Sequence, residues 1–246
     1  MINYRLFFLA FLMIATIQVD AQDNVVEVDE FNKLELGQRI RAILTPGETE
    51  SVKYELVGVH PDDLIIRSKG KTLEIYLEKA KNLEKQRKTY DHGYKQKEGW
   101  YEGSWVNVYV TYNTLKKLTT KGEEDLDITG TINTDVFKLK AYGDLEIEID
   151  DLTAEKLKVK LYGENDLDIK SGAIGIQKYK LFGENQIDTR DVRGELVKAT
   201  NYGESVIRVN TETVKFTVFG EIDVECGYGT NVRKGLVLGE YSVSQW

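Results

Sequence analysis

The chain of 246 residues has little cysteine and little proline, and each shortage excludes a class of structure. The single cysteine, Cys226, excludes an intramolecular disulfide framework, so stability has to come from a packed core and backbone hydrogen bonds. Both prolines, Pro46 and Pro61, lie before residue 62. Because proline removes a donor from a β-ladder, the long proline-free remainder suits continuous strands.

An excess of basic residues is also missing, which argues against nucleic acid as a partner. The chain has 33 lysines and arginines against 41 acidic residues, a formal net charge of -8. Binding to a phosphate backbone requires a basic footprint. We therefore expect no nucleic-acid partner.

Long apolar runs are absent except at the start of the chain. Leu6 to Val19 is an apolar run that follows Arg5 and ends near the small residue Ala21. These features are typical of a signal peptide, so we expect residues 1–22 to be removed on export. A retained anchor is the alternative, but the run is shorter than the roughly twenty residues that span a bilayer. No later segment is apolar enough, so we expect no transmembrane segment after signal removal.

The sequence does contain a repeated tripeptide of an aromatic residue, a glycine and an acid. Its central glycines are 20, 20, 20 and 17 residues apart. The five copies begin at Tyr142, Tyr162, Phe182, Tyr202 and Phe219. Self-similarity at this period is the signature of stacked repeats.

Apolar residues alternate with polar ones on both sides of each glycine, which indicates strands. The residues four and six positions after the glycines are apolar and are expected to point inward. Examples are Ile147 and Ile149 in one copy, and Ile207 and Val209 in another. A repeat cannot bury such a face alone, whereas stacked repeats form a continuous core. We expect an all-β fold, a single-stranded parallel β-helix (β-solenoid) with about 20 residues per rung. The regular rungs are expected over residues 119–246.

Charged residues form columns at the outward positions of this expected fold. Five residues before the glycines stand Lys138, Lys158, Lys178, Lys198, Lys215 and Lys234, and acidic residues follow the glycines from Glu123 to Glu240. Like charges stacked directly are unfavourable, so we expect neighbouring columns of opposite sign to relieve one another on a solvated face. A Ca²⁺ ion bridging the acidic column is the alternative, although no D-x-D-x-D-G loop is present.

The five motif aromatics stand an even number of residues from the charged columns, so strand alternation places them on the same outward side. If alternation continues to the corner, Tyr142, Tyr162, Phe182, Tyr202 and Phe219 form an exposed ladder, and flat rings suit sugar faces or peptide edges. If the corner changes the parity, they form an internal or half-buried stack. We expect the second arrangement and keep the first as a possible ligand platform.

Residues 23–118 are strand-like without a clear motif, and we interpret them as diverged first rungs that cap the solenoid. A charged segment at residues 78–104 interrupts them and contains four aromatic residues, Tyr90, Tyr94, Trp100 and Tyr101. We expect a protruding loop. Loops on rigid scaffolds often carry function, so a recognition loop is the alternative.

No catalytic apparatus is evident. His60 and His92 have no serine or cysteine partner at a recognisable spacing, and Cys226 fits a core column. Rungs of about twenty residues leave no long loops to wall a cleft, although carboxylates are plentiful. We expect no catalytic residues, no metal site and no cofactor.

The order of these features resembles the head GIN domain family of putative auto-transporter adhesins. The matching parts are Phe31 to Leu36, Leu73 to Leu77, Val106 to Thr111 and the glycine-centred repeats that follow. The resemblance implies a right-handed β-helix that is secreted or associated with the envelope of a Gram-negative bacterium. The family usually has Ser-Gly-Ser-Gly at its corners, whereas this chain has Tyr-Gly-Glu-Asn at 162–165.

We therefore expect an exported protein in the periplasm, at the outer membrane or outside the cell. Its expected role is a non-enzymatic binding or adhesion scaffold for a glycan or a surface protein. The alternatives are a polysaccharide lyase or hydrolase, because parallel β-helices host both, and a structural or assembly protein of the envelope. The sequence does not specify the ligand or the oligomeric state.

Overall fold

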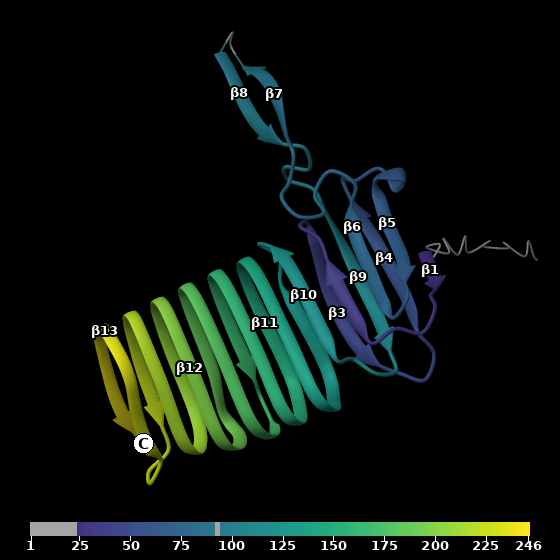
Figure 1. Cartoon of the computed structure of the whole chain (residues 1–246). Coiled ribbons are helices and arrows are strands. Elements are labelled where there is room, and N and C mark those ends of the chain that lie inside the picture. Colours follow the sequence, from purple (N-terminus) through teal and green to yellow (C-terminus); the bar gives the residue numbers. More distant parts are fainter. Residues whose placement is uncertain (1–23, 92–93) are drawn as a thin grey trace, which may run out of the picture.

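The computed structural model describes residues 24–91 and 94–246, and it is almost entirely β-structure (Figure 1). The expected signal peptide, residues 1–22, lies outside the described residues, as does His92. The strands and the single 3₁₀ turn are β1 (Asn24–Glu27), β2 (Lys33–Leu36), β3 (Ile40–Pro46), β4 (Ser51–Val57), η1 (Pro61–Asp63), β5 (Leu64–Lys69), β6 (Thr72–Leu77), β7 (Gln86–Asp91), β8 (Tyr94–Gly99), β9 (Trp105–Tyr112), β10 (Lys117–Gly122), β11 (Leu126–Ile169), β12 (Gly172–Cys226) and β13 (Asn231–Gln245).

The expected fold class, a right-handed single-stranded parallel β-helix with about 20 residues per rung, is wrong. The protein is all-β, but its main sheet is one curled, mixed sheet with both parallel and antiparallel pairs. Antiparallel pairs join β1 to β4, β4 to β9 and β5 to β6. In the stretch 23–118, which we interpret as diverged first rungs that cap the sheet, β2 and β3 pair in parallel with their neighbours, whereas β1, β4 and β5 pair antiparallel.

A tight turn explains the antiparallel pairing of β5 with β6. Lys69 pairs with Thr72 across a two-residue connection, in which Gly70 has a φ of 59°. A two-residue connection can join only antiparallel strands, because parallel neighbours need a crossover of a dozen or more residues. Alternation of apolar residues occurs in parallel and antiparallel strands alike, so the length of the connection determines how β5 and β6 pair.

Residues beyond β10 lie in parallel register at the spacing of the sequence motif. Leu161 pairs with Leu181, Tyr162 with Phe182 and Gly163 with Gly183. The long elements β11, β12 and β13 curl so that each turn of chain hydrogen-bonds to the next (Figure 1). The twenty-residue spacing therefore does bring equivalent residues side by side.

The core lies inside the curl and contains the inward columns expected from the sequence. Ile147, Ile149, Ile207 and Val209 are fully buried, and so is Cys226. Complete burial of each such aliphatic side chain contributes about 1.5–3 kcal/mol. Val243 is the exception at 40% exposed, because it belongs to β13, the last strand of the curl.

Candidate binding surface

A glycine at each motif corner lets adjacent turns approach closely. Gly163 has a φ of 108°, and a Cβ atom built on it would lie 2.1 Å from the carbonyl oxygen of Gly143. Both facts exclude a side chain there, since a positive φ is costly for L-residues and the neighbouring backbone cannot retreat. The corner separates two outer faces: one precedes the glycine and contains the aromatic residue, and the other follows it.

The five motif aromatics form one continuous stack on the outside of the curled sheet. Successive ring centroids are 4.7–4.8 Å apart and the ring planes differ by 2–4°. Tyr142 and Tyr202 are 36% and 42% exposed, and the three other rings are half-buried. The rings therefore keep the outward parity and form a largely half-buried stack on the outside, not an internal one.

The stack does not offer flat rings to a ligand. Each interior ring has one neighbour on each face at stacking distance, so its faces are covered by other aromatic rings. The three interior rings Tyr162, Phe182 and Tyr202 therefore present their edges, and the two tyrosines their hydroxyl ends, rather than their faces. A ligand platform at these residues would work by edge contacts and hydroxyl groups.

Lysines occupy the same outer face, next to the aromatic stack. Lys158 pairs in register with Lys178, and Lys160 with Lys180. Lys158, Lys178 and Lys180 are exposed and Lys160 is half-buried. The face that precedes the corner is therefore basic and aromatic.

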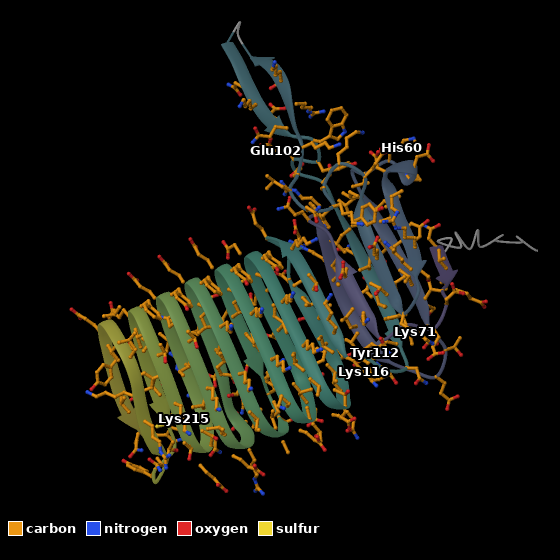
Figure 2. All side chains as sticks on the ribbon, in the orientation of Figure 1. His60, Lys71, Glu102, Tyr112, Lys116 and Lys215 are labelled. Atoms are coloured by element: carbon orange, nitrogen blue, oxygen red, sulfur yellow. The ribbon has the colours of Figure 1, made fainter. Side chains whose placement is uncertain are left out.

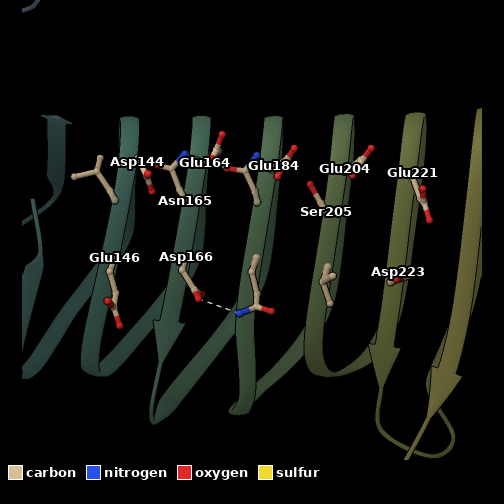
Figure 3. Close-up of a pocket in the computed structure, with 14 residues that line it drawn as sticks. Asp144, Glu146, Glu164, Asn165, Asp166, Glu184, Glu204, Ser205, Glu221 and Asp223 are labelled. Atoms are coloured by element: carbon tan, nitrogen blue, oxygen red, sulfur yellow. Dashed lines mark hydrogen bonds between the residues drawn. The ribbon is translucent and has the colours of Figure 1, made fainter. Parts of the chain in front are cut away.

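The face that follows the corner is acidic and hollowed (Figure 3). A shallow groove of about 620 Å³ runs across the turns, and Figure 3 shows two rows of acidic side chains along it. The first row is Asp144, Glu164, Glu184, Glu204 and Glu221, and the second includes Glu146, Asp166 and Asp223. Within the second row, Gln186 donates to Asp166 at 2.9 Å.

Buried amides lie behind the acidic rows. Asn165 and Asn185 are each 5% exposed, and the Asn165 amide nitrogen donates to the Asn185 oxygen at 3.1 Å. In the next turn Ser205 donates to Asn201, whose amide donates to the carbonyl of Glu221 at 2.6 Å. These bonds tie neighbouring turns together beside the groove.

The repulsion between like charges is not relieved by the neighbouring columns that we expected to relieve it. Three acidic residues five positions after the glycines form ion pairs. Asp188 pairs with Arg190, two positions further along the same turn, at 2.6 Å, and Glu148 pairs with Lys170 of the following turn at 2.6 Å. Glu225 pairs with Arg208, which occupies the same column one turn earlier, at 3.1 Å. The lysine columns lie beyond the corner and do not take part. Burial, with the neighbouring charges of Asp188 and Glu148, raises the pKa of Asp168 above its usual range.

The segment at residues 78–104 forms a hairpin that projects from the body (Figure 1). Strands β7 and β8 pair antiparallel, and Arg39 holds the base of the hairpin through Glu84 at 2.9 Å. Trp100 is 40% exposed with Lys79 4.1 Å from its ring centroid, whereas Tyr101 is buried in the core and burial raises its pKa to about 12. Tyr90 and Tyr94 lie in the two strands, but the side chains of residues 90–95 fall outside the described part.

Residues with catalytic or ligating chemistry do not gather at one place. In residues 24–91 and 94–246 there is no group of three His, Cys, Asp or Glu side chains that could hold a metal ion. His60 lies at the start of η1 (Figure 2), whereas Cys226 is buried at the end of β12. Over the same residues, no helix is long and apolar enough to cross a membrane.

A family model described as "putative auto-transporter adhesin, head GIN domain" matches residues 30–227. The chain belongs to this family. The match covers the N-terminal mixed strands, the hairpin and most of the curled sheet. The head GIN assignment expected from the sequence is therefore confirmed.

Solved structures from Bacteroides and Parabacteroides species have the same fold. A putative adhesin from Bacteroides fragilis is 21% identical with a TM-score of 0.70, over 90% of this chain and 95% of the other. A putative adhesin from Parabacteroides distasonis is 14% identical with a TM-score of 0.63, over 91% and 96% of the two chains. A putative lipid-binding protein from the same species is 11% identical with a TM-score of 0.55, over 92% and 96%. At these identities the likeness shows the fold of the head GIN chain and nothing more; no curated protein matches it in sequence.

Proposed function

We propose that this head GIN protein is an exported protein of the cell envelope that binds a partner without catalysis, as an adhesion scaffold. The observation that carries the proposal is the ordered outer face. Five stacked aromatics and the adjacent lysines repeat along the curled sheet, on a framework held by backbone ladders. A rigid surface of this kind binds with little loss of conformational freedom.

Family membership and the descriptions of related structures support the same role. The matching family model and two of the neighbours cited above carry the description of adhesin, and a third is described as lipid-binding. All three descriptions concern binding. We infer export from the apolar run Leu6 to Val19 and from the family description together.

A binding screen with matched variants tests the proposal. The chain without residues 1–22 is screened against neutral and acidic glycans, peptidoglycan and matrix proteins, beside a Tyr162→Ser/Tyr202→Ser double variant. Both rings lie on the outside, so the variant folds, and loss of binding assigns the contact to the aromatic stack. Tyr228→Ser is the control, because Tyr228 is 83% exposed and lies outside the stack.

The proposal predicts binding to at least one class of partner, reduced by the double variant and unchanged by the control. If the intact chain binds nothing in the screen, the scaffold role is wrong. If the double variant folds and binds as tightly as the intact chain, the stack makes no contact with the partner and the binding face has to be elsewhere.

A further inference from the structure

A column of basic residues runs across the turns of the curled sheet on the face that precedes each corner. Strand pairing places Lys33 beside Lys117 and Lys117 beside Lys138, then Lys158 beside Lys178, and finally Lys215 beside Arg233. The aromatic stacks fix the same register for the remaining turns. We call this set the basic column: Lys33, Lys117, Lys138, Lys158, Lys178, Lys198, Lys215 and Arg233.

The basic column is largely without acidic partners. Among the described residues, only Lys117 of this set has an ion pair, with Glu35 at 2.8 Å. A second, shorter column of Lys140, Lys160 and Lys180 lies between the basic column and the aromatic stack, since residues two apart point to the same side. The acidic rows line the groove on the other side of the glycine corner.

Stacking like charges in this way costs stability. Adjacent turns are about 4.8 Å apart, and like charges directly opposite one another destabilise a sheet. The chain as a whole is acidic, with a net charge of -8, yet it concentrates cations on this one face. An anionic partner along the column would relieve the repulsion and release counterions.

The shape of the face indicates which anion fits. The basic column is one residue wide and perpendicular to the strands, so it matches a linear chain of negative charges. Nucleic-acid bases bind single-strand proteins by stacking on aromatic faces, but here those faces are covered by each other. The exposed tyrosine hydroxyls and ring edges next to the lysines suit the hydroxyl groups and C–H edges of sugars.

We propose that the basic column binds an acidic polysaccharide, whose carboxylate-bearing chain lies along the curled sheet and perpendicular to its strands. This inference builds on the proposed scaffold function by naming the class of partner. The lysines neutralise the carboxylates, and Tyr142, Tyr162 and Tyr202 contact the sugar hydroxyls. The acidic groove beyond the corner repels the same chain and confines it to the basic face.

Polygalacturonate is the probe, and dextran is the uncharged comparison. The intact chain, a Lys158→Gln/Lys178→Gln/Lys198→Gln variant and a Lys71→Gln/Lys88→Gln/Lys170→Gln control are titrated at several salt concentrations. Both variants remove the same charge, but only the first removes it from the basic column. We expect the column variant to bind polygalacturonate at least about 10-fold more weakly, and its slope of log K against log salt to be smaller by about 2 units. The control should bind within about twofold of the intact chain.

Other outcomes overturn the inference. Equal losses in both variants would show that net charge alone matters, and salt-independent binding would exclude ion pairing. Tighter binding to single-stranded DNA or to phosphatidylglycerol vesicles would assign the column to another class of polyanion. If light scattering detects self-association at low salt and the column variant loses it, the basic column binds the acidic face of a second copy of the chain. Binding of dextran or a matrix protein instead would preserve the scaffold function and reject only this inference.

Discussion

At the scale of single residues, the corner glycines fix the distance between turns. Gly183 has a φ of 101°, and a Cβ atom there would meet the carbonyl oxygen of Gly163 at 2.3 Å. A methyl group has to push two hydrogen-bonded turns apart, in addition to the strain of a positive φ.

Gly183→Ala is therefore expected to destabilise the protein by about 2–4 kcal/mol, the sum of backbone strain and overpacking. Urea denaturation followed by circular dichroism measures the change. Gly227→Ala is the matched control, because its φ is not positive and the nearest atom to the new Cβ lies at 3.6 Å. Equal stability of the two variants would show that turn spacing does not depend on the corner glycine.

Glu74 is a buried carboxylate held between two cations at the N-terminal end. One of its oxygens accepts from Lys81 at 2.8 Å and lies 2.6 Å from Arg67, and the residue is 8% exposed. The hydrogen bond from Lys81, with Arg67 adding to it, holds the pKa of Glu74 below its ordinary value of 4.5 despite the opposing effect of burial.

Acidification should remove the stability that the ionised Glu74 carboxylate contributes. The folded chain binds the Glu74 proton less readily than the unfolded chain, so the stabilisation is present above pH 4.5 and is lost as the pH falls through the lowered pKa. Glu74→Gln should cost about 1–2 kcal/mol at neutral pH and lose less stability on acidification below pH 4.5 than the wild type. Chemical denaturation at several pH values checks this, with Glu30→Gln as the exposed control. Parallel pH profiles for wild type and Glu74→Gln would contradict it.

At the scale of elements, the aromatic stack acts as an external brace along β11 and β12. Tyr162 has a stacked ring on each side, whereas Tyr142 has only one. Each stacked pair contributes about 0.5–1.5 kcal/mol beyond the area that it buries.

The cost of removing a ring should therefore depend on its place in the stack. Tyr162→Ser is expected to destabilise by about 1–3 kcal/mol, and Tyr142→Ser by about half of that, because one pair is lost instead of two. Both variants keep the core intact, so they should unfold cooperatively in a thermal melt monitored by circular dichroism. A larger cost at Tyr142 than at Tyr162 would mean that stacking is not the source of the stabilisation.

The hairpin of β7 and β8 is an element with its own two-stranded sheet, separate from the main one among the described residues. Replacing residues 87–98 by two glycines keeps the terminal pair of Gln86 and Gly99. The midpoint of thermal unfolding should stay within about 3 °C, since no strand of the main sheet loses a partner. A shift of more than about 10 °C would show that the hairpin supports the core.

At the scale of the whole molecule, the sequence predicted which residues lie side by side in adjacent turns better than it predicted the direction of the strands. The spacing of the glycine motif correctly placed Tyr162 next to Phe182 and put Ile147 and Ile207 inside. The mixed topology was missed because apolar alternation is the same in parallel and antiparallel strands. For β5 and β6 the direction is set by the two-residue connection at Gly70, whereas β1, β4 and β9 pair antiparallel over long stretches of chain.

The binding face was predictable in part. Outward parity identified the aromatics and the lysines as surface residues, but it could not tell that ring faces would cover one another at 4.7 Å. The partners of the charges were missed because the glycine corner separates columns that are only a few residues apart. A basic residue two positions after the acid was the signal for the pair of Asp188 and Arg190, whereas the pairs between turns, such as Glu225 with Arg208, had no such local signal.

The central claim is that the basic column on the outer face is the binding surface, and lysine footprinting tests it most directly. Acetylation of the intact chain is compared with and without polygalacturonate, and each modified lysine is quantified by mass spectrometry. Protection is predicted at Lys138, Lys158, Lys178, Lys198 and Lys215, with Lys71 and Lys170 unchanged as controls on other faces. Protection confined to the hairpin lysines Lys88 and Lys97, or equal at every lysine, would contradict the account.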